Sequence, residues 1–182
     1  RYLTLGYRES EDIVLWAKRV AEFYPQAKIV LHGVSMGAAT VMMAAGREDL
    51  PSEVVAAVED CGYTNADELI AMQMENSFGL PAFPAMNLLN WRCEKVAGFN
   101  LHDAAPIDAV RHARVPILFI HGTKDTLVPP NMAEQLYAAA NAPKKELLMI
   151  PGAVHAAASQ ADQQTYFRTI RKFVQPYMEE QK

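Results

Sequence analysis

A glycine–serine turn between a short strand and a helix constrains the fold of this sequence more than any other feature. Residues 28–32 are a largely apolar run typical of a buried strand, and the alanine-rich residues 36–45 favour a helix. Between them, residues 33–37 read Gly-Val-Ser-Met-Gly, the pattern G-x-S-x-G. A strand-to-helix turn this short holds its central residue in a strained backbone conformation. We therefore expect the turn to raise the Ser35 hydroxyl clear of the sheet, where it can act as a nucleophile.

Three neighbours of Ser35 have expected roles in this turn. Gly33 and Gly37 are expected to be required, because a side chain at either position would collide with the neighbouring strand or helix. The first amides of the new helix point toward Ser35, so its positive end lies where an oxyanion would form. The backbone amide of Met36 is therefore the predicted oxyanion-hole donor. The alternative is a plain structural turn, and the flanking strand and helix favour the nucleophile.

Further apolar runs alternate with helical patterns along the chain. Strands are predicted at residues 54–58, 116–121 and 146–150, and helices at residues 10–24, 131–140 and 160–177. Continuously apolar strands separated by helices indicate the α/β class, a predominantly parallel sheet with flanking helices. The first helix has an apolar stripe of Ile13, Trp16, Ala17, Val20 and Tyr24. The last helix is predicted to face the core with Tyr166, Phe167, Ile170, Phe173, Val174 and Tyr177.

Four polar side chains follow the ends of the predicted strands. Ser35, Asp60, Asp125 and His155 each come shortly after one of these strands. Right-handed crossovers place the segments that follow parallel strands at one edge of the sheet, where ligands bind. We therefore expect the four residues to belong to one site.

Three motifs resemble those of the α/β-hydrolase superfamily, and the resemblance extends over nearly the whole chain. They are the elbow at residues 33–37, His-Gly-x-x-Asp-x-x-Val-Pro at residues 121–129 and Pro-Gly-x-x-His at residues 151–155. The stretches at residues 58–64 and 78–81 are similar to those of bacterial members in the esterase-like and serine aminopeptidase-like group. The resemblance implies a single α/β-hydrolase domain over residues 1–182. It implies no metal and no organic cofactor.

A serine hydroxyl needs a base with a near-neutral pKa and a carboxylate that fixes the tautomer of that base. His155 is the predicted base, because it lies in a loop after a strand and fits the chain order serine, acid, histidine that the resemblance implies. The other histidines are weaker candidates. His121 ends a strand, and His32 is expected to be buried beneath the elbow. His102 and His112 lie on polar stretches and are expected at the surface.

Asp125 is the predicted acid, because it follows the strand that precedes the His155 strand. An ordinary turn-forming aspartate is the alternative at that position. Asp60 is the second candidate acid, since some relatives in the superfamily have their acid after the corresponding strand. If it is not the acid, it is expected to contact the catalytic residues without taking part in the reaction.

Part of the expected fold has no counterpart in this sequence. By resemblance, the absent strands include the loop that supplies the second oxyanion donor, and Thr4-Leu5-Gly6 is too close to the first helix to replace it. Loss of one donor typically lowers turnover about 10²–10³-fold. We therefore expect an α/β-hydrolase fold lacking its first strands, the C-terminal part of a longer enzyme. A compact variant is the alternative. The open edge of strand 28–32 should aggregate, or pair with the absent N-terminal half or a second copy.

Residues 64–105 interrupt the alternation of strands and helices. They are rich in methionine and aromatic residues and contain no clean strand, which predicts a small helical cap insertion within the domain. Flexible methionines suit an apolar acyl or aromatic pocket. The alternative is that these side chains form the core of the insertion itself.

Composition argues against several other classes of function. The net charge is −4 and no cluster of lysine and arginine occurs, which argues against a nucleic-acid partner. No apolar run reaches the roughly 18 residues that a membrane span requires. The two cysteines, Cys61 and Cys93, have neither the number of a disulfide framework nor the spacing of a metal motif. Cys61 is expected to be buried at a strand end.

The predicted function is a serine hydrolase that cleaves ester or amide bonds of a small-molecule substrate through an acyl-enzyme. One alternative is an acyltransferase, which would use the same triad but exclude water from the acyl-enzyme. The other is a catalytically incompetent binding module with the same fold.

Overall fold

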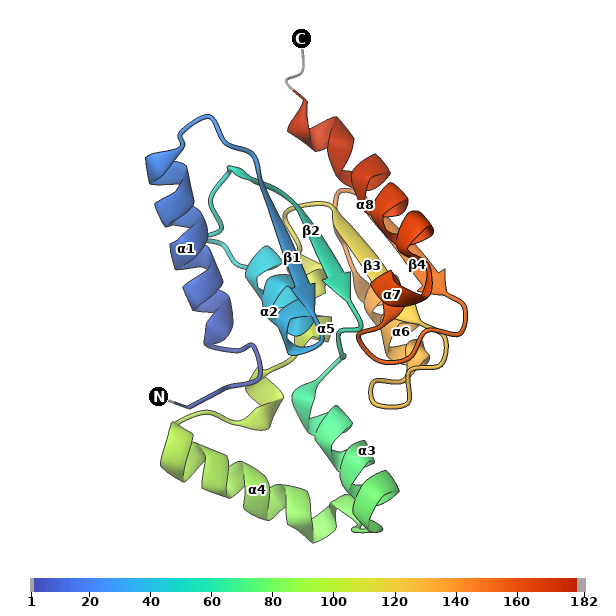
Figure 1. Cartoon of the computed structure of the whole chain (residues 1–182). Helices are drawn as coiled ribbons and strands as arrows, with labels where there is room; N and C mark the ends of the chain where they lie inside the picture. Colours follow the sequence, from blue (N-terminus) through green and yellow to red (C-terminus); the bar gives the residue numbers. More distant parts are fainter. Residues whose placement is uncertain (1, 180–182) are drawn as a thin grey trace.

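The computed structural model describes residues 2–179, which contain a parallel sheet of four strands in the order β1-β2-β3-β4 (Figure 1). The strands are β1 (Ile29–Val34), β2 (Val54–Asp60), β3 (Ile117–Gly122) and β4 (Lys145–Ile150). Each strand pairs in parallel with its neighbour, so the carboxyl ends of all four lie at one edge. The α/β class and the parallel sheet expected from the sequence are confirmed.

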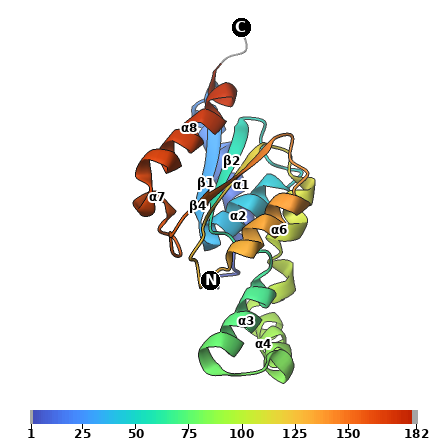
Figure 2. The same cartoon turned by 90° about the vertical axis from the view of Figure 1, so that its right-hand side faces the viewer.

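Helices cover both faces of the sheet (Figure 2). On one face lie α1 (Glu9–Phe23), α2 (Met36–Ala45), α5 (Pro106–Ala109) and α6 (Pro130–Ala139), and on the other lie α7 (Ala158–Ala161) and α8 (Gln163–Met178). Short 3-10 helices span Leu101–Asp103 and Val110–His112. In the described part of the chain, no helix has both the length and the apolar character that crossing a membrane requires.

Alternate residues of the strands build two separate cores. Ile117 and Phe119 pack toward α2 and α6, in a cluster that includes Met42 and Leu136. Their neighbours Leu118 and Ile120 face the opposite way, toward Tyr166 and Phe173 of α8. Burial on both faces explains why these strands are continuously apolar in the sequence.

The face that α1 buries differs from its predicted apolar stripe. Val14 and Ala17 are buried with Ser10, whereas Trp16 and Tyr24 are 69% and 67% exposed. The reason is that β1 is the edge strand and α1 packs mainly on α2, so a narrow strip of the helix meets the core. The edge of β1 that faces away from β2 is unpaired among residues 2–179, as expected for this strand.

The C-terminal segment forms two helices instead of one. The chain breaks at Asp162, whose carboxylate accepts a hydrogen bond from the Thr165 amide and so caps α8. Tyr166 and Phe173 are buried as predicted, but Phe167 is 48% exposed. Phe167 follows Tyr166 by one residue, and the 100° turn between them carries its ring off the face that meets the sheet.

The helical insertion, residues 64–105, projects from the sheet as two helices, α3 (Ala66–Phe78) and α4 (Ala82–Ala97) (Figure 1). Its helical character is as predicted. Met86, Phe99 and Leu101 form its own small core. Ile70, Met74 and Leu89 pack, partly buried, against this core. Five further large apolar side chains of the insertion are exposed, namely Phe78, Leu80, Phe83, Leu88 and Trp91.

The two glycines of the elbow differ in what surrounds them. A Cβ on Gly33 would lie 2.1 Å from the carbonyl oxygen of Gly37, whereas a Cβ on Gly37 would meet nothing within 4 Å. The expectation that both glycines are sterically required is therefore wrong for Gly37, because the position that a Cβ would take there is open.

Gly33→Ala is expected to destabilise the protein by about 3 kcal/mol or more, because backbone of the elbow must move to admit the methyl group. Gly37→Ala is the matched control. It should be neutral or stabilising by up to about 1 kcal/mol, since alanine is the better helix former. Urea unfolding of the two variants measures the difference, and equal losses of stability would contradict this picture of the turn.

Candidate active site

Ser35 lies at the turn between β1 and α2 with φ of 56° and ψ of −118°. Non-glycine residues rarely adopt a positive φ, and such strain is often found at functional sites. The Ser35 amide donates a hydrogen bond of 2.8 Å to the carbonyl oxygen of Asp60, which ties the turn to the end of β2. Because α2 begins at Met36, the first amides of the helix lie next to the serine. The strained elbow expected from the sequence is present.

His155 lies in the loop between β4 and α7, within hydrogen-bonding distance of Ser35. Its Nε2 accepts a hydrogen bond of 2.8 Å from Oγ of Ser35. Its Nδ1 donates a hydrogen bond of 2.7 Å to Oδ2 of Asp125. The imidazole is 20% exposed, so it faces solvent on one side while both ring nitrogens are engaged. The structure therefore brings together the serine, histidine and aspartate that the sequence selected.

Asp125 is buried in the loop after β3, where several donors surround its carboxylate. Oδ1 accepts hydrogen bonds of 2.9 Å from the amides of Leu127 and Val128, and Oδ2 accepts the bond from His155. Burial alone would raise the pKa of Asp125. The hydrogen bonds from His121, from the Val128 amide and from His155 outweigh burial, so the pKa of this carboxyl lies below its usual value. The carboxylate is thus ionised at neutral pH and fixed in orientation.

His121 supports the loop that carries Asp125. It is completely buried at the end of β3, and its Nε2 donates a hydrogen bond of 2.9 Å to the carbonyl oxygen of Val128. The same nitrogen lies 3.4 Å from Oδ2 of Asp125. Sequence reasoning considered His121 as a competing base and missed this contact. The signal was its position four residues before Asp125 in the His-Gly-x-x-Asp motif, where a strand end adjoins the acid loop.

Asp60, the second candidate acid, belongs to a different hydrogen-bond chain. Its Oδ2 accepts a hydrogen bond of 3.0 Å from the Tyr166 hydroxyl, and that hydroxyl accepts a bond of 3.0 Å from Nε2 of His32. Burial raises the pKa of Asp60 despite the Tyr166 hydroxyl. Since His155 is already bonded to Asp125, the geometry favours Asp125 as the acid and assigns Asp60 to the neighbouring contact with α8.

The remaining histidines lie apart from Ser35. His32 is exposed, so the expectation that it is buried beneath the elbow is wrong. β1 is the edge strand, so one side of the His32 ring stays open to solvent, while the other side lies against Tyr166. His102 and His112 are exposed, as predicted.

Glu59 is a fully buried carboxyl close to the site, and no sequence pattern predicted its burial. Oε2 accepts a hydrogen bond of 2.9 Å from the Gly62 amide, and Oε1 has no hydrogen-bond partner in the part of the chain that the structure describes. Burial raises the pKa of Glu59 to about 8. The folded protein therefore holds a proton on this side chain at pH values where the unfolded chain has lost it.

Glu59 is expected to make the folded state less stable as the pH rises. Between the unfolded pKa of 4.5 and the folded pKa of about 8, the folded state binds the extra proton. The free energy of unfolding should therefore fall by up to about 1.4 kcal/mol per pH unit in that window and level off above it. Glu59→Gln keeps an acceptor for Gly62 and should remove this contribution. Urea unfolding of both proteins across the window checks it, and parallel pH profiles would refute it.

The predicted oxyanion-hole donor, the Met36 amide, lies at the start of α2. The amides of Thr4 and Gly6 are already bonded to the carboxylate of Glu9, at 3.0 and 2.9 Å. The amides of Thr4 and Gly6 are therefore not free to act as donors. This agrees with the expectation that residues 4–6 cannot supply the second oxyanion donor.

The helical insertion contacts the acid loop directly. Nε2 of Gln73, on α3, donates a hydrogen bond of 2.7 Å to the carbonyl oxygen of Leu127. The Leu127 amide in turn donates to Asp125. The insertion is thus held next to the carboxylate, although its role over the site stays a prediction.

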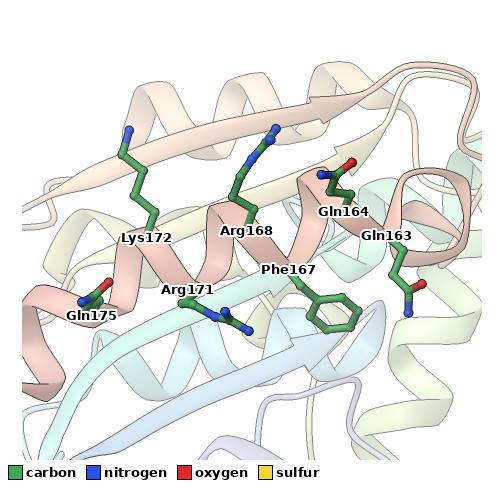
Figure 3. A pocket seen from close by; sticks show the side chains of 7 residues that line it. All are labelled: Gln163, Gln164, Phe167, Arg168, Arg171, Lys172 and Gln175. Carbon is green, nitrogen blue, oxygen red and sulfur yellow. The ribbon is translucent and has the colours of Figure 1, made fainter.

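A groove along α8 is separate from this group of residues. Figure 3 shows Arg168 and Lys172 on one side of the helix and Phe167 and Arg171 on the other, with glutamines at both ends of the row. None of the residues that line this groove belongs to the serine, histidine and aspartate group. The groove therefore does not serve as the candidate active site.

The sequence is similar to a known protein family and to several curated proteins. The profile of the prolyl oligopeptidase family matches residues 2–181. Among curated proteins, "Uncharacterized protein YqkD" of Bacillus subtilis is 27% identical over 146 residues, which are 80% of this chain and 47% of that protein. "Alpha/beta hydrolase domain-containing protein WAV2" of Arabidopsis thaliana is 27% identical over 131 residues, 65% of this chain and 42% of that protein. The chain spans less than half the length of these two relatives.

Solved structures with the same fold include hydrolases. The esterase Pf2001 of Pyrococcus furiosus superposes with a TM-score of 0.73 and 23% identity, over 98% of this chain and 66% of that one. The acylaminoacyl peptidase of Pyrococcus horikoshii superposes with a TM-score of 0.65 and 16% identity, over 95% of this chain and 28% of that one. These similarities show that the fold is that of the α/β-hydrolases.

Proposed function

Because this chain belongs to the prolyl oligopeptidase family, a family of hydrolases, we propose that it is a serine hydrolase. Ser35 is the nucleophile, His155 the base and Asp125 the acid that orients the base. The observation that supports this proposal best is the continuous pair of hydrogen bonds, 2.8 Å from Ser35 to His155 and 2.7 Å from His155 to Asp125. The positive φ of Ser35 adds to it.

In the first half of the reaction, Oγ of Ser35 attacks the carbonyl carbon of the substrate. Nε2 of His155 accepts the hydroxyl proton, and the carboxylate of Asp125 stabilises the imidazolium that forms. The Met36 amide donates a hydrogen bond to the oxyanion. The imidazolium then passes its proton to the leaving alcohol or amine, which departs and leaves an acyl group on Ser35.

In the second half, a water molecule attacks the acyl-enzyme. His155 takes a proton from this water and returns it to Oγ of Ser35 as the acid product leaves. The exposed side of the imidazole gives water a route to the acyl group. This access to solvent favours hydrolysis over transfer to another acceptor.

The proposed substrates are small-molecule esters or amides with an apolar acyl or aromatic group. The apolar side chains of the helical insertion, held near Asp125 through Gln73, support this choice. We propose that the insertion acts as a cap in which methionine and aromatic side chains contact the apolar part of the substrate.

A series of chromogenic esters with increasing acyl length, and the matching anilides, tests the proposal. The expected result is release of the free acid, with a faster rate for apolar acyl groups than for acetyl. An added primary alcohol separates the alternatives, because an acyltransferase would form mainly the new ester. Binding of esters by calorimetry without any product would indicate a binding module and would overturn the proposal.

A further inference from the structure

Three potential metal ligands meet beside Ser35 at the carboxyl ends of three strands. Sγ of Cys61, a carboxylate oxygen of Asp125 and a ring nitrogen of His155 all lie within 4.8 Å of one another. Cys61 directly follows β2, Asp125 follows β3 and His155 follows β4. The residues are far apart in the sequence, so their spacing could not reveal the cluster. Thiolate, imidazole and carboxylate are the ligands that zinc prefers.

We propose that this cluster binds a thiophilic divalent cation, with Zn²⁺ as the best match to its donors, and that the bound cation switches the triad off. The effect on turnover rests on the proposed function. Binding of the cation does not depend on that function, because Ser35 is not among the proposed ligands. The site would be inhibitory, and the reaction proposed above uses no metal.

The geometry needs a modest adjustment to hold zinc. Zinc bonds of about 2.0–2.3 Å in a tetrahedral arrangement separate neighbouring ligand atoms by about 3.3–3.6 Å. The hydrogen-bonded pair of Asp125 and His155 would open from 2.7 Å toward that separation, and the Cys61 thiol would close toward it from no more than 4.8 Å. Val154 and Ala156, on either side of His155, are exposed, so a cation can approach the cluster from solvent on this side.

Supporting contacts for such a site are already in place. Oδ1 of Asp125 is fixed by two backbone amides, which leaves Oδ2 for a metal. Second contacts of this kind orient ligands in metal sites and strengthen binding. The fourth position of a tetrahedral ion would be taken by water.

Local electrostatics favour a cation beside the thiol. Burial raises the pKa of the Cys61 thiol to about 12, so the thiol stays neutral until a cation displaces its proton. In addition, Oδ1 of Asp60 is buried and has no hydrogen-bond partner within the described residues. A dication would offset this excess of buried negative charge.

Binding would remove the base from catalysis through two proton movements, one at Cys61 and one at His155. The Cys61 thiol releases its proton to solvent as its sulfur binds the metal. The metal takes the lone pair at Nδ1 of His155, so the imidazole proton moves to Nε2. That nitrogen then carries a proton and can no longer accept the hydroxyl proton of Ser35. The Asp125 oxygen that oriented the base binds the cation instead.

Cobalt(II) titration of the full chain tests binding without reference to activity. The Ser35→Ala variant, which lacks the nucleophile, should still show the thiolate-to-cobalt charge-transfer absorption in the near ultraviolet. The Cys93→Ser variant should show it too, and there the band can come only from Cys61, because the chain has two cysteines. Absence of the band from these two proteins would overturn the proposal. Cys61→Ser, where it folds, should lack the band.

Zinc inhibition tests the effect on the triad. Adding Zn²⁺ should lower the turnover of the wild type and of Cys93→Ser, and excess chelator should restore it. Cys61→Ser should require at least about tenfold more Zn²⁺ for the same inhibition, since one ligand is gone. Equal sensitivity of Cys61→Ser and Cys93→Ser would show that zinc acts elsewhere and would refute the site. A cobalt band without any turnover in the wild type would instead refute the proposed hydrolase and leave the metal site standing.

Discussion

Replacing Ser35 with alanine is expected to lower kcat by about 10⁵–10⁶-fold while the protein stays folded. The hydroxyl makes its described hydrogen bond to His155, and the backbone bond from the Ser35 amide to Asp60 does not depend on the side chain. The loss of activity should therefore come from the chemistry and not from the fold. Steady-state kinetics on the best ester substrate measures kcat.

Thermal unfolding is the control for Ser35→Ala. Its stability should stay within about 1 kcal/mol of the wild type, since the change removes one partly exposed hydroxyl. A variant that keeps more than about one hundredth of the wild-type kcat would show that another residue is the nucleophile.

Asp125→Asn is expected to lower kcat by about 10⁴-fold. The asparagine oxygen can still accept the hydrogen bonds that Leu127 and Val128 give to Oδ1. Its NH2 group, in the place of Oδ2, cannot accept a hydrogen bond from Nδ1–H of His155, so the imidazole takes the wrong tautomer. The fold of the loop should therefore survive while the base is lost.

Asp60→Asn is the matched control for the acid. Asp60 is also a buried aspartate at a strand end, but its described side-chain hydrogen bond is to Tyr166 and not to His155. We expect a loss in kcat of less than about tenfold for this variant, because the bond between His155 and Asp125 is untouched. A larger loss from Asp60→Asn than from Asp125→Asn would reverse the assignment of the acid.

The sequence predicted those parts of the structure that depend on local patterns. The run before the elbow, the alanine-rich helix after it and the later apolar runs gave the four strands and the helix α2. The candidate serine, histidine and aspartate follow three of these strands, and parallel strands end at one edge of a sheet. Their contact follows from the parallel arrangement of the strands. Motifs this specific allow a single sequence to predict that arrangement.

The parts that could not be predicted depend on packing between distant segments. Trp16 and His32 are exposed because β1 lies at the edge of the sheet, which periodicity along the chain does not encode. The support of Asp125 by His121 depends on how the acid loop folds back on β3. The cluster of Cys61 with Asp125 and His155 likewise needs three strand ends side by side.

The proposed mechanism needs donors for the oxyanion, and the described residues offer one at a predicted position. Thr4 and Gly6 use their amides to bind Glu9, so the Met36 amide is the donor with a defined position in the described chain. The chain spans less than half the length of the two curated relatives, so the activity of the whole protein stays a proposal. A turnover about 10²–10³-fold below that of a complete site is the expected consequence of one donor alone.

Covalent labelling with a fluorophosphonate distinguishes an assembled triad from an inert fold. The purified chain is incubated with the reagent, and intact mass and peptide mapping locate the adduct. We expect a single adduct on Ser35, no adduct in Ser35→Ala and much slower labelling in Asp125→Asn, because the reagent needs a serine activated by an oriented histidine. No adduct on the wild type, or an adduct that persists in Ser35→Ala, would contradict the proposed role of Ser35.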